Sequence, residues 1–180
     1  MTTVFSAAPT ASSAVPLALD GDEAAFRWIV ETHISGMTQV CFVVCGDRDL
    51  ADEAVAASWP IAWQKLSSLR DPSSLRPWLV TIAANQARQL AGRRRVRTLH
   101  EVPVQDAKAA TMTLDREEQM DLANALRRLG PADRALLALR YVAGLNSTEL
   151  ATATGLTPSG TRARLARLLD RMRTELGNDQ

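Results

Sequence analysis

Apolar residues recur every three or four positions along most of the chain. No segment alternates apolar and polar residues as a half-buried strand does. Between Glu23 and Val44 the apolar stripe includes Phe26, Ile29 and Met37, which predicts a long helix with one buried face. A second stripe over 50–66 includes Trp59 and Trp63 on its buried side. The remaining stripes lie at 74–90, 114–129, 132–142, 148–154 and 158–176. The sequence therefore predicts an all-α fold.

Two segments interrupt the helical pattern and divide the chain. Residues 1–19 contain Ala, Ser, Thr and Pro without Lys or Arg, so we expect a disordered tail and no secretory signal. Residues 98–114 include Pro103 and lack a sustained period, which predicts a flexible linker. We expect two small helical domains, at 20–97 and 115–177. Because no apolar run approaches about 20 residues, we expect no membrane insertion. With only two cysteines and no secretory signal, a cytoplasmic location is expected by elimination.

Charge is distributed in blocks along the chain. The formal net charge is only +1, which by itself argues against a nucleic-acid-binding protein. Residues 65–97, however, carry a net charge of +7 and residues 122–180 a net charge of +4. Residues 20–53 and 98–121 are acidic, with net charges of −6 and −4. The sequence therefore predicts two positively charged surfaces on an almost neutral protein.

The C-terminal segment has the organisation of a helix-turn-helix unit. Ser147 is a candidate cap for a short helix over 148–154, Gly155 fits a left-handed turn, and Pro158 begins a second helix. In this motif the N-terminal part of the second helix enters the major groove, while arginines contact bases and phosphates. The candidate DNA-binding residues on that helix are Ser159, Thr161, Arg162, Arg164 and Arg167.

These residues resemble a known family. The segments 139–145, 149–151 and 162–167 (LRYVAGL, ELA and RARLAR) are similar to region 4 of bacterial RNA polymerase sigma factors of the sigma-70 family. Upstream, residues 49–55 (DLADEAV) resemble region 2.2, and residues 78–85 (WLVTIAAN) with the Arg93–Arg95 cluster resemble regions 2.3–2.4. The likeness covers about 22–97 and 115–176 in the same order and is nearest to the extracytoplasmic-function (ECF) class.

The resemblance implies a transcription initiation factor that binds core RNA polymerase and promoter DNA. Region 2 would bind the β′ clamp helices and melt the −10 element, and region 4 would read the −35 element and contact the β flap. An anti-sigma factor is a further implied partner. The implied −10 residues are Trp78, Asn85, Arg88, Arg93, Arg94 and Arg95, although a place in the core is the favoured interpretation of Trp78. The implied polymerase-binding residues are Asp49, Asp52, Glu53, Ala56 and Ala57.

The chain departs from the family pattern at two places. Ala56 and Ala57 stand where the family has Gln-Glu, and Pro60 follows shortly after them. The second departure is at the start of the second helix of the predicted unit. The family usually has Gly at the position of Ser159, a small residue or Thr at Gly160, and Val at Thr161. Ala56 and Ala57 leave open a degenerate sigma-like adaptor that binds polymerase or an anti-sigma factor without melting DNA. A stand-alone helix-turn-helix regulator is the other alternative.

The potential metal ligands follow the apolar face of the first helix. His33, Met37, Cys41 and Cys45 step by four, which permits a metal or redox site but is expected from a buried core. No nucleophile–base pair and no phosphate-binding loop stands out. We therefore expect no enzyme activity, no catalytic residues, no cofactors and no metal.

Overall fold

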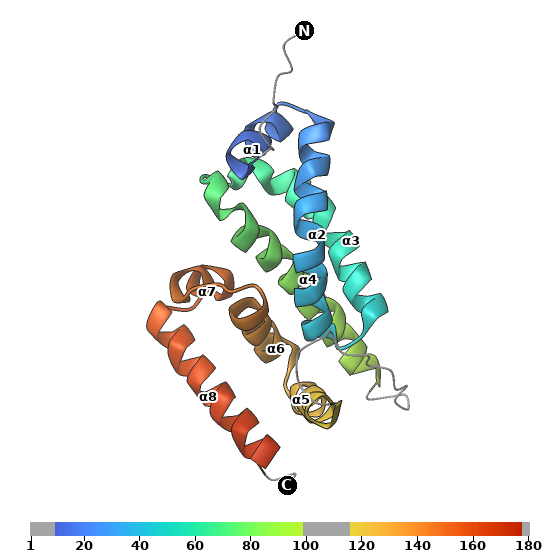
Figure 1. Cartoon of the computed structure of the whole chain (residues 1–180), viewed down its shortest axis with the longest axis vertical. Coiled ribbons are helices and arrows are strands. Elements are labelled where there is room, and N and C mark those ends of the chain that lie inside the picture. Colours follow the sequence, from blue (N-terminus) through green and yellow to red (C-terminus); the bar gives the residue numbers. More distant parts are fainter. Residues whose placement is uncertain (1–9, 99–115, 178–180) are drawn as a thin grey trace.

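A computed structural model describes residues 10–98 and 116–177, and the described residues are helical with no strand (Figure 1). The first half contains α1 (Ala11–Leu19), α2 (Glu23–Cys45), α3 (Arg48–Lys65), the 3-10 turns η1 (Leu66–Ser68) and η2 (Pro72–Ser74), and α4 (Leu75–Thr98). The second half contains α5 (Arg116–Arg128), α6 (Pro131–Leu137), the π-helical turn η3 (Ala138–Val142), α7 (Ser147–Thr154) and α8 (Pro158–Gly177). The predicted all-α fold is confirmed.

The corner between α2 and α3 follows directly from its sequence. Gly46 ends α2 in the left-handed conformation at φ 68°, which costs glycine no steric strain. Asp47 then caps α3, and its side chain accepts a hydrogen bond from the Leu50 N–H at 3.0 Å. Because the corner is only two residues long, α2 and α3 pack side by side as an antiparallel pair.

Helix α2 lies at the centre of the first half. It packs against α1, α3 and α4, and its fully buried side chains include Ile29, Met37, Val40 and Val44. Contrary to the sequence-based expectation, α2 is long and apolar enough to cross a membrane by length and composition alone. Its buried stripe, however, is covered by neighbouring helices, as expected of a core helix.

The predicted disordered tail is wrong for residues 11–19. They form α1, whose Ala14, Val15 and Ala18 are almost completely buried against α2 and the η1–η2 segment. Three small apolar residues on one face are enough to order α1, because their small side chains allow it to approach the apolar helix α2 closely. Thr10 and Ser13 add reciprocal hydrogen bonds at the N-terminus of α1. Residues 1–9 lie outside the described residues.

The two halves share one hydrophobic core. α6 and η3 pack against both α2 and α4, so the buried residues of α5–α8 continue the core of the first half. In Figure 1, α6 lies next to α4, and α8 lies on the side of α6 away from α2. The predicted flexible linker at 98–114 lies outside the described residues, except that Thr98 is the last residue of α4.

Candidate nucleic-acid and polymerase surfaces

The helix-turn-helix unit is fixed by two caps. Asn146, rather than the expected Ser147, caps α7: its Oδ1 accepts from the N–H groups of Thr148 and Glu149 at 2.9 and 3.0 Å. The Glu149 carboxylate in turn accepts a hydrogen bond from the Asn146 N–H at 2.7 Å. This reciprocal arrangement satisfies three N–H groups that a bare helix end would expose. Gly155 then turns the chain at φ 69°, as its sequence position predicts.

The first turn of α8 is closed by Thr157. Its Oγ1 accepts from the Gly160 N–H at 3.1 Å, and its carbonyl accepts from the Thr161 N–H at 2.8 Å. A Cβ at Gly160 would lie 3.1 Å from this same hydroxyl, so any larger residue would push against the cap. The unusual Gly160 therefore fits the local geometry of the capped turn.

The outer face of α8 carries three of the predicted DNA-binding residues. Ser159, Arg162 and Arg167 are exposed. Thr161 does not belong with them: its side chain is 0% exposed and lies on the same stripe as Leu165 and Leu168. The predicted DNA contact by Thr161 is inconsistent with this placement, because a fully buried side chain cannot reach a base edge. Arg164 is only partly exposed and is bound to Asp133.

On α4, the residues expected at the −10 element share one face but differ in exposure. Trp78, Asn85 and Arg88 are spaced by seven and three residues, which places them along one side of the helix. Arg88 is exposed and Asn85 is half-buried. Trp78 is also half-buried and packs against the core, which supports a structural role for it.

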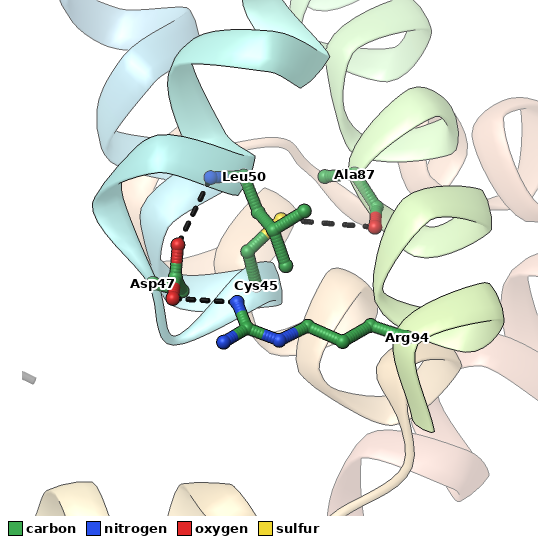
Figure 2. A network of polar contacts seen from close by, with 5 residues as sticks. All are labelled: Cys45, Asp47, Leu50, Ala87 and Arg94. Carbon is green, nitrogen blue, oxygen red and sulfur yellow. Dashed lines mark hydrogen bonds and ion pairs between the residues drawn. The ribbon is translucent and has the colours of Figure 1, made fainter. Parts of the chain in front are cut away.

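The arginine cluster at the end of α4 is partly engaged within the protein. Arg93, Arg94 and Arg95 are all exposed, but the Arg94 Nη1 lies 2.6 Å from Asp47 Oδ2 (Figure 2). Partial burial raises the pKa of Asp47, but the Leu50 N–H and the Arg94 guanidinium outweigh it and hold that pKa below its usual range. Asp47 therefore caps α3 and ties it to α4 through one carboxylate.

The outer face of α3 presents all five residues expected to contact the polymerase. Asp49, Asp52, Glu53, Ala56 and Ala57 are exposed. This face begins with acidic side chains and continues with small apolar ones, so it offers charge at one end and a flat surface at the other.

Trp63 extends this α3 face and was wrongly assigned to the core by its spacing. Its side chain is 45% exposed, and its ring contacts Phe26 edge-on with centroids 4.7 Å apart. Trp63 lies seven residues after Ala56, two helical turns further along the same side. The sequence signal that could have located it is its helical spacing from Ala56 and Pro60, which places all three residues along one side of α3.

The Cys41–Cys45 pair belongs to the core. Their thiols donate to the carbonyl oxygens of Ala83 and Ala87 on α4, at 3.5 and 3.7 Å. Burial raises the pKa of Cys41 to about 12 and that of Cys45 to about 11, which disfavours the reactive thiolate. Within residues 10–98 and 116–177, no group of three His, Cys, Asp or Glu side chains is placed to hold a metal ion.

Comparison with known proteins relates this geometry to one family. Residues 29–97 match the Sigma-70 region 2 family. "ECF RNA polymerase sigma factor RpoE" of Cereibacter sphaeroides is 32% identical, over 86% of this chain and 88% of its own length. "Probable RNA polymerase sigma factor RfaY" of Xanthomonas campestris is 28% identical over 90% of this chain, which spans only 43% of that relative.

A solved structure has the same fold. It contains the sigma factor RpoE in complex with the anti-sigma factor NepR from Bartonella quintana. The TM-score is 0.69 at 20% identity, and the match covers 86% of this chain and 98% of that one. Fold and sequence together define a bacterial RNA polymerase sigma factor of the sigma-70 family. Within that family, the likeness to the C. sphaeroides protein is decisive: the chain belongs to the ECF class, whose members are transcription initiation factors.

Proposed function

We propose that this protein binds core RNA polymerase and directs it to promoters through two separate DNA-binding surfaces. Residues 20–97 form region 2, which binds the β′ clamp helices and melts the −10 element. Residues 115–177 form region 4, which reads the −35 element and contacts the β flap. The observation that carries the proposal is the exposed, arginine-bearing outer face of α8 behind a turn capped at both helices.

At the −35 element, Arg162 and Arg167 contact bases and phosphates, and Ser159 lies at the start of the same exposed face. At the −10 element, Arg88, Arg93 and Arg95 follow the backbone of the melted strand, while Asn85 and the accessible part of Trp78 contact bases. Arg94 contributes charge to the same surface while it stays paired with Asp47.

The test is reconstitution with core polymerase. A pull-down should retain the protein on core polymerase, and run-off transcription should begin from a DNA sequence that the reconstituted enzyme selects from a random pool. Arg162→Ala should weaken binding to that sequence by roughly 1–3 kcal/mol. If wild-type protein does not associate with core polymerase, the proposal is wrong.

One observation favours a second candidate, the sigma-like adaptor that binds polymerase or an anti-sigma factor without melting DNA. Ala56 and Ala57 are exposed on the α3 face and offer no side-chain hydrogen bond. Potassium permanganate footprinting distinguishes the two functions, because an initiation factor exposes unpaired thymines at the −10 element and the adaptor leaves the duplex paired.

An anti-sigma factor is proposed as a further partner, one that covers regions 2 and 4. The support is that the B. quintana sigma factor of the same fold was solved with such a protein. We also propose that the protein acts in the cytoplasm, where core polymerase and promoter DNA are found, and that it requires no cofactor.

A further inference from the structure

Arg164 is held by a carboxylate from another helix. Its Nε and Nη2 both donate to Asp133 Oδ1, at 3.1 and 2.6 Å. Asp133 lies in the first turn of α6, and the two side chains keep only 37% and 22% of their exposure. Two guanidinium N–H groups donate to one partly buried carboxylate oxygen, so this contact has a more defined geometry than a mobile surface ion pair.

Arg164 also points away from the other candidate arginine. Side chains two positions apart on an α-helix point in directions that differ by about 200°, so Arg162 and Arg164 project from opposite flanks of α8. The buried stripe, which includes Thr161, Leu165 and Leu168, separates the two flanks on the inner side. Arg162 can therefore enter a DNA groove from the exposed face while Arg164 faces α6.

We propose that Arg164 is a positioning residue, which fixes the recognition helix α8 against α6 through Asp133 instead of contacting DNA. The inference rests on the proposed function, because it assigns Arg164 a role within −35 recognition. The ion pair joins the first turn of α6 to the first half of α8, and the short helix α7 lies between these two helices in the sequence. It therefore sets the angle at which α8 presents Arg162 and Arg167.

The direction in which one substitution changes DNA affinity separates positioning from direct contact. If Arg164 contacts DNA, Asp133→Asn releases its guanidinium, removes a negative charge near DNA, and should tighten binding. If Arg164 positions α8, the same change should weaken binding. The probe is a duplex that wild-type holoenzyme has selected from a randomised pool, with affinity measured at several salt concentrations.

We expect Asp133→Asn and Arg164→Gln each to weaken binding roughly tenfold, because each breaks a hydrogen-bonded ion pair. The double variant should be no weaker than either single variant, because both act on one contact. The salt dependence should not change for Arg164→Gln, since no phosphate contact is lost. Arg162→Gln is the matched control: it should reduce the salt slope by about one or relax specificity at one base, and should add independently to Asp133→Asn.

Three results would overturn the positioning role: tighter or unchanged binding by Asp133→Asn, a salt slope reduced by about one in Arg164→Gln, or additive losses in the double variant. Asp133→Glu, which keeps the carboxylate, should retain most of the affinity. If Asp133→Asn does not fold, the salt slope of Arg164→Gln decides alone. If wild-type holoenzyme selects no sequence at all, the proposed function fails, which is a different outcome from every one above.

Discussion

Replacing Thr161 by Val should stabilise the protein. The Thr161 side chain is completely buried, and its Oγ1 forms no hydrogen bond with any of the described residues. A buried hydroxyl without a partner costs about 1–3 kcal/mol. Valine has nearly the same shape and a similar helix propensity, so it removes this cost without opening a cavity. We expect the free energy of unfolding to rise by about 1–3 kcal/mol.

Urea denaturation of the full chain measures this gain. With a slope near 2 kcal/mol per molar urea, the midpoint should rise by about 0.5–1.5 M while the slope stays unchanged. Thr174→Val is the matched control on the same helix, because the exposed Thr174 hydroxyl donates to the Asp170 carbonyl at 3.0 Å. That control should change stability by less than about 0.5 kcal/mol.

The reasoning is refuted if Thr161→Val leaves the midpoint unchanged or lowers it, because the hydroxyl would then have a partner that compensates its burial. Binding of the selected promoter gives an independent check on the role of Thr161. A variant that is more stable and binds DNA normally has lost only a buried polar group. A variant that folds but loses sequence preference would return Thr161 to the set of DNA-contacting residues.

The other predictions concern the polymerase face, acid stability and non-specific DNA binding. Ala56→Gln with Ala57→Glu should tighten polymerase binding, measured against Ala132→Gln as an exposed control; no change would show that this contact is not made. Burial, assisted by Arg76, lowers the pKa of His33 below 6.5, so the unfolded chain takes up a proton first and stability falls with the pH below about 6.5. Urea midpoints at pH 7.5 and 5 should therefore fall further for wild type than for His33→Gln, and equal losses would contradict this. With a net charge of only +1, the free protein should bind random duplex DNA weakly, and strong salt-sensitive binding would count against that view.

The spacing of apolar residues, together with glycine, proline and capping residues, predicted most of the helices. The Gly155 turn needs only local geometry and is found at the expected position. The sequence was less informative where exposure depends on a distant helix. Trp63 and Thr161 were both assigned to the wrong side, because spacing defines the faces of a helix but not which neighbour covers each face. Helix α1 was missed for the same reason: its short apolar stripe is ordered by the surface that it packs against.

The two proposed DNA surfaces impose a condition on the arrangement of the halves. If the −10 and −35 elements lie about 25 base pairs apart, as their names indicate, they are separated by roughly 85 Å along B-DNA at 3.4 Å per base pair. A compact chain of 180 residues is only about 40 Å across. In the structure α6 and η3 pack against α2 and α4, which holds the halves together through a shared core. If both proposed surfaces bind their elements at once, α5–α8 must therefore move away from α1–α4. That movement would expose the buried faces of α6 and η3, which in this structure pack against α2 and α4.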